Sequence, residues 1–223
     1  MPPVTPSLRR ERALLRRGSS AVAGMDEVGR GAIAGPVSVG VVAVSAATTT
    51  APRGLRDSKL LSVERRESLV PLLKKWAEFW AVGHASSAEI DRWGISSALR
   101  LAGLRALRQC EPVTDLVLDG RHDWLTAPPN SETESCEWPD VAIPRVHVMV
   151  KADQKCSSVA AASVVAKVTR DHMMIERHER FPAYAWNRNK GYGTADHHEA
   201  MARHGFSREH RRSWALKGLT IEN

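Results

Sequence analysis

The chain has 223 residues, of which 43% are hydrophobic and 26% charged, and its formal net charge of +7 favours a polyanionic partner such as nucleic acid. Three cysteines without a Cys-x-x-Cys pair argue against a disulfide framework and a zinc ribbon. No apolar run approaches the roughly 20 residues that span a bilayer, and the N-terminus lacks the apolar core of a signal peptide, so we expect a cytoplasmic protein without membrane contact.

The first 20 residues carry three prolines and a basic run that extends from Leu8 to Arg17. Leu8, Leu14 and Leu15 would form the thin apolar stripe of a short helix. Two alternatives remain open for this segment. It is either a helix that docks on the domain or a loose basic arm.

Two runs of small and β-branched residues, over 21–27 and 37–45, predict buried strands. Between them stand the adjacent carboxylates Asp26 and Glu27, followed by Gly-Arg-Gly and Gly-Pro. Neighbouring strand residues point to opposite faces, so the two acids can share an ion only if the strand ends or twists there, which glycine permits. A bare Asp-Glu pair would favour a polar turn with a surface salt bridge. The pair together with glycines at a strand junction favours a functional site.

The next elements predict a helix, a strand and a helix. A helical pattern begins at Ser62, and residues 79–85 have the composition of a strand. Ser87 is expected to cap a short helix that Gly94 breaks. Residues 95–107 predict an amphipathic helix whose small residues allow close packing on a sheet.

Residues 115–120 predict a short apolar strand that ends with Asp119 in an Asp-Gly pair. A carboxylate at the C-terminal end of a buried strand is a common ligand position in α/β sheets, although an Asp-Gly turn is also common in purely structural positions. The polar, acidic and proline-rich segment 121–140 predicts an inserted surface loop.

The last third of the chain predicts a strand, a long central helix of small residues, a loop and a short helix, over residues 146–150, 157–180, 184–189 and 194–204. Asp153 follows the strand, Thr194 is expected to cap the last helix, and Gly205 to end it. Residues 207–214 form a short basic segment. The order of elements predicts one mixed α/β sheet covered by helices.

Four acids stand at or after the ends of apolar strands: Asp26, Glu27, Asp119 and Asp153. If these ends converge in one sheet, four carboxylates need divalent cations to offset their repulsion. Ligation by oxygen alone selects Mg²⁺ or Mn²⁺ over Zn²⁺, and the histidines and cysteines lack the regular spacing of a zinc site. Two divalent ions about 4 Å apart catalyse in-line displacement at phosphorus.

Several cations and one tyrosine would suit a polyanionic substrate that must reach these acids, although most lysines and arginines are solvated surface residues. They are Arg30, Lys59, Lys151, Lys167, Arg170, Lys190 and Tyr192. A tyrosine between two glycines is usually a loop anchor, but beside a nucleic-acid site it can stack on a base or sugar.

These motifs together resemble type 2 ribonuclease H, the bacterial ribonuclease HII family. The resemblance runs in order from about residue 21 to 214, so no single short pattern carries it. Its motifs are Asp26–Gly31 with Ala34–Pro36, Asp57–Lys59, Leu118–Gly120, Val150–Asp153, Ala160–Asp171, Lys190–Thr194 and His210–Ser213.

The resemblance implies a ribonuclease H-like mixed sheet flanked by helices, with a helical C-terminal part. It implies a two-metal hydrolase, dependent on Mg²⁺ or Mn²⁺, in which the four acids are catalytic metal ligands. Its substrates would be RNA–DNA hybrids and ribonucleotides embedded in duplex DNA, cut to leave 3′-hydroxyl and 5′-phosphate ends during ribonucleotide excision repair. We expect a monomer with a basic arm over 1–20, a catalytic domain over 21–214 and a tail over 215–223.

The resemblance also implies how the substrate is recognised. Gly29, Arg30 and Gly31 would read the 2′-hydroxyl that distinguishes RNA from DNA. Tyr192 would pack against the next sugar, a deoxyribose at a junction. Residues that would contact phosphate or support the metal ligands are Lys59, Lys151 and Lys167.

Two other functions remain open. A DNA nuclease or Holliday-junction resolvase of the same fold would share the acids but would not need Gly-Arg-Gly and Tyr192 together. A non-catalytic nucleic-acid-binding module would tolerate the loss of an acid, and here all four are present. Residues 216–223 lack the aromatic pair that docks on a sliding clamp, so we predict no such docking.

Overall fold

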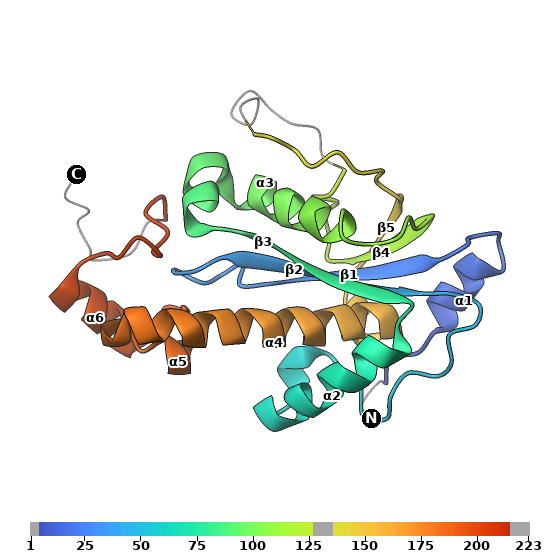
Figure 1. Cartoon of the computed structure of the whole chain (residues 1–223), viewed down its shortest axis with the longest axis horizontal. Coiled ribbons are helices and arrows are strands. Elements are labelled where there is room, and N and C mark those ends of the chain that lie inside the picture. The colour runs from blue at the N-terminus through green and yellow to red at the C-terminus, as the bar shows by residue number, and fades with distance from the viewer. Residues whose placement is uncertain (1–4, 127–135, 215–223) are drawn as a thin grey trace.

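The computed structural model describes residues 5–126 and 136–214, where a five-stranded mixed sheet lies between helices (Figure 1). The strands are β1 (Val22–Val28), β2 (Val37–Val44), β3 (Phe79–Ala85), β4 (Asp115–Asp119) and β5 (Arg145–Met149). Their order is β3-β2-β1-β4-β5, with β2 antiparallel to both β1 and β3, and β4 parallel to both β1 and β5. The predicted mixed α/β sheet is confirmed.

Six helices and three 3₁₀ turns are described. The helices are α1 (Arg9–Leu15), α2 (Val63–Trp76), α3 (Ser87–Leu107), α4 (Ser157–Arg180), α5 (Trp186–Asn189) and α6 (Ala195–His204). The 3₁₀ turns are η1 (Ser58–Leu60), η3 (Ala152–Gln154) and η4 (Pro182–Tyr184). None of the helices in this part of the chain is long and apolar enough to cross a membrane.

Most predicted elements of the second half are confirmed, including the Thr194 cap of α6 and its end at Gly205. One cap, earlier in the chain, and one loop were predicted wrongly. Ser86 caps α3 in place of Ser87, because its hydroxyl accepts from the backbone of Glu89 while the Glu89 carboxylate binds the Ser86 backbone in return. The segment 184–189, predicted as a loop, forms the end of η4 and the one-turn helix α5.

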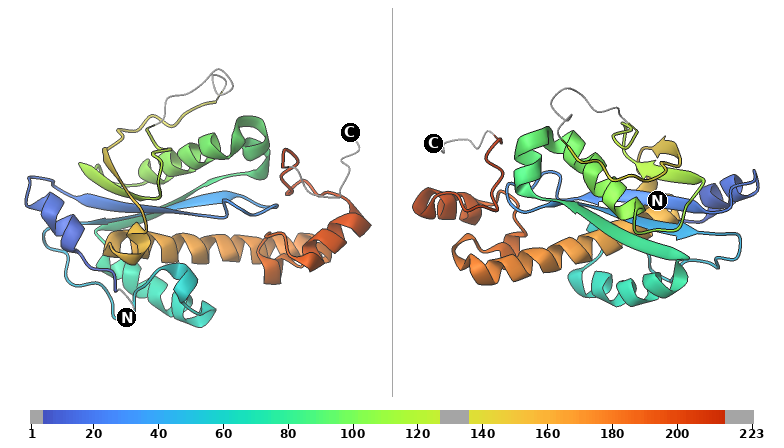
Figure 2. Two further views of the ribbon diagram at one scale, coloured as in Figure 1. Left: turned by 180° about the vertical axis from the view of Figure 1, so that it is seen from behind. Right: turned by 45° about the horizontal axis from the view of Figure 1, so that its top comes forward.

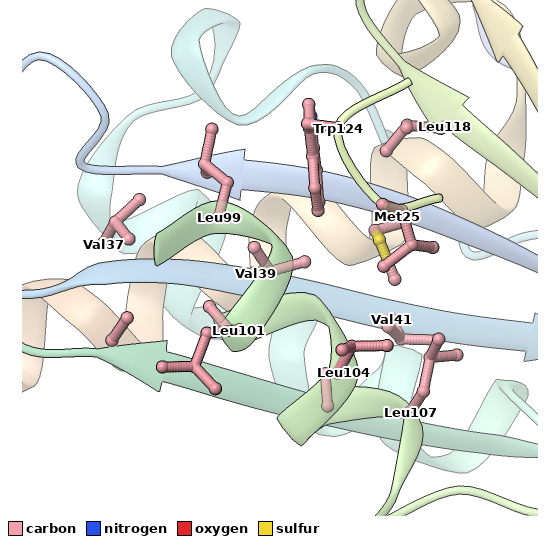
Figure 3. Packing of buried hydrophobic residues seen from close by; sticks show 14 of the residues in the cluster. Met25, Val37, Val39, Val41, Leu99, Leu101, Leu104, Leu107, Leu118 and Trp124 are labelled. Carbon is pink, nitrogen blue, oxygen red and sulfur yellow. The ribbon is translucent and has the colours of Figure 1, made fainter. Parts of the chain in front are cut away.

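Helix α3 covers one face of the sheet and closes the larger hydrophobic core (Figure 3). On β2, Val37, Val39 and Val41 face this core, whereas Val42 faces the opposite side, as the alternation of a strand requires. Strand β2 is therefore buried on both faces, which accounts for its small, uncharged and mostly β-branched residues.

Helix α4 runs beneath β1 and β2 on the opposite face, with α2 packed beside it (Figure 1). Its first turns are built from small side chains such as Ala160, Ala161 and Ala162, all fully buried. Small residues let the helix approach the strands closely: a Cβ on Gly40 of β2, the residue that pairs with Asp26, would lie 2.4 Å from the carbonyl oxygen of Ala162. This places α4 directly under the ends of the acid-bearing strands.

The N-terminal helix α1 is docked, as the first of the two alternatives predicted. Leu8 and Leu14 are buried in a third apolar cluster. Glu11 is completely buried, and one of its oxygens accepts hydrogen bonds from the backbone N–H of Ser158 at 2.9 Å and from its hydroxyl at 2.8 Å. Glu11 thus caps the start of α4 and fixes α1 to it.

The prediction that 121–140 is a surface loop was wrong for its flanks. Trp124 and Leu125 are buried in the core under α3, and Cys136 is buried there too. The loop was predicted from the acidic and proline-rich composition of the whole segment, which does not indicate that single apolar residues within it are buried. Residues 127–135 lie outside the described part of the chain.

Candidate active site

The sheet brings three of the four predicted acids to one place. Asp26 lies near the end of β1 and Asp119 ends the neighbouring parallel strand β4. Met25 pairs with Leu118 in the parallel register, so the two acids that follow them lie side by side. Glu27, next on β1, is partly exposed.

Asp153 reaches the same place by a different route. The chain leaves β5, turns through Lys151 with left-handed dihedrals of φ 57° and ψ 42°, and forms η3. One carboxylate oxygen of Asp119 accepts a hydrogen bond of 2.6 Å from the backbone N–H of Ala152. This contact fixes η3 against the end of β4 and brings Asp153, which is buried, towards the other acids.

The electrostatics of the acids show that they are crowded. Burial, followed by the charge of Glu27, raises the pKa of Asp26 well above its usual value, and Asp119 and Asp153 act in the same direction. Burial and the charges of Asp119 and Asp57 raise the pKa of Asp153 to about 6. Asp26 and Asp153 therefore resist ionisation because they are buried and because other carboxylates lie nearby, which is the situation that a bound cation relieves.

A fifth acid, Asp57, belongs to this group and was not predicted. It caps η1 by accepting from the backbone N–H of Lys59 at 3.0 Å, and its carboxyl shares a hydrogen bond with that of Asp153 which favours the protonated form. Burial opposes the charged form of Lys59, but Asp26, Asp57, Asp153 and Asp119 outweigh it and raise its pKa. The sequence signal was the Asp57–Lys59 motif, in which only the lysine had been singled out.

The donor set fits a divalent cation. Only carboxylates contribute, and hard cations such as Mg²⁺ and Mn²⁺ prefer oxygen ligands. One carboxylate oxygen of Asp153, Oδ1, is buried without a hydrogen-bond partner among the described residues, and a cation would satisfy it. Across residues 5–126 and 136–214, no three His, Cys, Asp or Glu side chains stand close enough together to hold a metal ion, so the acids do not form a closed cage.

The Gly-Arg-Gly loop follows β1 at the edge of this acidic centre. Gly29 has a φ of +83°, and a Cβ there would lie 2.1 Å from Nε of Arg170, so only glycine fits. A Cβ on Gly31 would meet no atom within 4 Å, so this residue faces open space. The guanidinium of Arg30 lies 3.4 Å from a carboxylate oxygen of Glu27 and remains half exposed.

Tyr192 lies beside the same loop because its neighbour Gly191 is bound to it. The carbonyl oxygen of Gly191 accepts from the backbone N–H groups of Ile33 at 2.9 Å and Ala34 at 3.1 Å. The Tyr192 ring is half-buried, with the guanidinium carbon of Arg170 5.5 Å from its centroid. Tyr192 is thus held next to the loop that follows β1.

The predicted lysines separate in space. Lys59 faces the acids, whereas Lys167 binds Asp171 at 2.6 Å and lies 6.0 Å from the centroid of the Tyr192 ring. Lys151 is exposed and makes no hydrogen bond or ion pair with the acids in the described structure. Only Lys59 is therefore placed to act beside the acidic centre.

Two histidines, His197 of α6 and His210 of the C-terminal segment, are buried and support the Tyr192 loop. His197 donates from Nδ1 to the Tyr192 carbonyl oxygen at 2.9 Å, and its Nε2 accepts from the indole of Trp186 at 3.0 Å. His210 lies 3.1 Å from the same Nε2, and burial lowers its pKa to about 4. The sequence signal for His210 was its place at the start of the His210–Ser213 motif.

Comparison with known proteins gives a family match of wide extent. The sequence fits the family model "Ribonuclease HII" over residues 23–217. It is 43% identical over 217 residues to a ribonuclease HII of Streptomyces avermitilis, covering 96% of this chain and 86% of that one. The ribonuclease H2 of Pyrococcus horikoshii OT3 has a TM-score of 0.67 at 25% identity, covering 87% of this chain and 94% of that one. The RNase HII of Archaeoglobus fulgidus, solved in complex with PCNA, has a TM-score of 0.67 at 28% identity, covering 90% and 98%.

Proposed function

The chain belongs to the ribonuclease HII family and is a hydrolytic endoribonuclease that acts on RNA in RNA–DNA hybrids, and from that premise we propose that it also cuts 5′ of ribonucleotides embedded in duplex DNA. The proposed products carry 3′-hydroxyl and 5′-phosphate ends. One observation supports this proposal above the others: Arg30 of the Gly-Arg-Gly loop contacts Glu27 of the acidic group, and Gly191, the neighbour of Tyr192, binds the same loop.

In this proposal Asp26, Glu27, Asp119 and Asp153 would hold two divalent ions, Mg²⁺ or Mn²⁺. Such ions, when bound, activate the attacking water and stabilise the leaving oxygen of an in-line displacement. Asp119 also keeps η3 in place through the Ala152 N–H.

The remaining residues position the substrate. Lys59 and Arg30 lie at the edge of the acidic centre and offset its negative charge towards an incoming phosphate. Lys59, Lys151 and Lys167 are proposed to contact phosphate or to support the metal ligands. Lys59 is the foremost candidate, because it alone of the three faces the acids. Gly29, Arg30 and Gly31 would read the 2′-hydroxyl, and Tyr192 the sugar that follows.

The decisive experiment compares a duplex that contains one embedded ribonucleotide with the same duplex made only of DNA. We expect cleavage of the first alone, on the 5′ side of the ribonucleotide. A DNA nuclease would cut both, whereas a junction resolvase or a binding module would cut neither. The reaction should stop in excess chelator and return with Mg²⁺ or Mn²⁺; full activity in chelator would contradict the metal-ion proposal.

Partners and location beyond the nucleic-acid substrate remain predictions. The Archaeoglobus fulgidus RNase HII was solved with PCNA, whereas the residues on which we based the prediction of no clamp docking, 216–223, lie outside the described part of this chain. A monomeric state and a cytoplasmic location likewise stay predictions.

A further inference from the structure

Arg211 is a fully buried arginine that binds backbone and no acid. Its guanidinium donates to the carbonyl oxygens of Gly29 at 2.7 Å, of Arg30 at 2.9 Å and of Gly35 at 3.1 and 3.2 Å. It forms no ion pair with any acid in the described part of the chain. A buried charge is costly unless it is hydrogen-bonded. The carbonyl groups of the loop between β1 and β2 therefore replace water as hydrogen-bond acceptors for the Arg211 guanidinium.

The C-terminal segment brings Arg211 to this loop. After α6 the chain returns to the tip between β1 and β2 (Figure 1), and the left view of Figure 2 shows the same proximity from behind. The backbone N–H of Arg211 donates to Ile33 at 2.9 Å, and the N–H of Gly35 donates to Glu209 at 2.8 Å. The guanidinium therefore approaches the loop from a fixed backbone.

The geometry of the peptide bond determines what these contacts do to the loop. All peptide bonds in the described chain are trans, so the C=O of one residue and the N–H of the next point in opposite directions. The Gly29 and Arg30 carbonyls point to Arg211. The N–H groups of Arg30 and Gly31 must therefore point away from it.

These two N–H groups are also the ones left available. The following four residues all donate to backbone carbonyls: Ala32 to Gly29, Ile33 and Ala34 to Gly191, and Gly35 to Glu209. The N–H groups of Arg30 and Gly31 have no acceptor among the residues that the structure describes. Since Gly31 faces open space, the donors are directed to where a ligand could sit.

We propose that Arg211 is a positioning residue for ribonucleotide selection: by binding the Gly29 and Arg30 carbonyls it directs the Arg30 and Gly31 N–H groups at the 2′-hydroxyl. This inference rests on the proposed function of the Gly-Arg-Gly loop. An arginine suits the task because its planar fork presents five fixed donors, whereas a lysine offers a single ammonium. Burial and the nearby charge of Arg170 lower the pKa of Arg211 to about 9, which leaves it protonated at neutral pH.

The test compares Arg211→Gln and Arg211→Lys with the matched control Arg177→Gln. Arg177 binds the Glu209 carboxylate at 2.9 Å, so it supports the same segment without touching the loop carbonyls. For each variant the dissociation constants of a duplex with one ribonucleotide and of the all-DNA duplex are measured in chelator, so that neither is cut. Their ratio is the ribonucleotide preference.

Both Arg211 variants should lose the preference by about 10-fold, as expected when two hydrogen bonds are misdirected, while affinity for the all-DNA duplex changes little. The control should keep the wild-type preference. An Arg211 variant that retains the preference would overturn the inference, as would one that loses affinity for both duplexes equally. A wild-type protein that neither prefers nor cuts the ribonucleotide duplex would instead refute the proposed function.

A measurement on the wild-type protein covers the case in which the variants do not fold. Amide hydrogen exchange at Arg30 and Gly31 should slow when the ribonucleotide duplex is bound, and slow less with the all-DNA duplex. Equal protection by the two duplexes would show that these donors do not read the hydroxyl and would overturn the inference.

Discussion

Asp119 accepts a hydrogen bond of 2.6 Å from the backbone N–H of Ala152, and this contact joins the end of β4 to the turn that carries Asp153. The same carboxylate is one of the proposed metal ligands. Asp119 therefore makes a structural hydrogen bond and is also a proposed metal ligand. Different substitutions can test these two roles separately.

Asp119→Asn should keep the structural contact, because an amide oxygen can still accept from Ala152, but it removes a charge from the metal site. We expect the cleavage rate to fall by about 10² to 10⁴ with a nearly unchanged melting temperature. Asp119→Ala should lose the acceptor as well and melt lower. If Asp119→Asn melts much lower and loses activity only in proportion to unfolding, Asp119 is a structural residue.

Asp153 should make the stability of the metal-free protein dependent on pH. Its pKa is about 6 in the folded chain against an ordinary 3.8, so between these values the folded state binds more protons than the unfolded state. The free energy of unfolding should therefore fall as pH rises from about 4 to about 6.

Asp153→Asn should consequently raise the melting temperature of the metal-free protein at about pH 8, by roughly 2–4 °C, and the gain should vanish below about pH 4. Asp196→Asn is the control, because Asp196 lies on the surface with its side chain 70% exposed. Added Mg²⁺ should stabilise the wild type more than the Asp153 variant. A destabilised variant at about pH 8 would contradict the crowding of the acids.

Substitutions of Tyr192 and Arg30 should reduce the cleavage of different substrates. Tyr192→Ala should reduce kcat/KM most on a single embedded ribonucleotide or an RNA–DNA junction, and less on a continuous hybrid, because its ring is proposed to pack on a deoxyribose. Arg30→Ala should reduce both and weaken binding through the lost charge. The two variants are compared on both substrates at one salt concentration. An equal loss on both substrates for Tyr192→Ala would make the tyrosine a loop anchor.

Leu125 tests the correction made to the segment 121–140. Its side chain is fully buried under α3, so Leu125→Ala should lower the free energy of unfolding by about 2–5 kcal/mol. Leu72→Ala is the control, because Leu72 is 49% exposed on α2 and should cost at most about 0.5 kcal/mol. Denaturant unfolding measures both. A small effect at Leu125 would show that this flank is dispensable.

The sequence alone determined the elements that carry the chemistry. Apolar runs with an acid at or near their ends predicted the strands of Asp26 and Asp119. A buried strand can be recognised in this way because its pattern lies in consecutive residues. The small residues of 157–180 predicted a central helix, because its first turns are too apolar to face water. The order of the motifs predicted the family, which the comparisons confirmed.

Tertiary structure alone decided which distant residues complete the site. Asp57 joins the acids from a separate turn, and Arg211 reaches the Arg30 carbonyl across 181 positions of the chain. No spacing pattern in the sequence indicates either contact. An arginine that binds backbone carbonyls can have the same neighbours in sequence as an arginine that is exposed to solvent. The burial of Leu125 was not predicted either, because composition describes a whole segment. Burial is instead determined for each side chain by what the rest of the fold packs against that side chain.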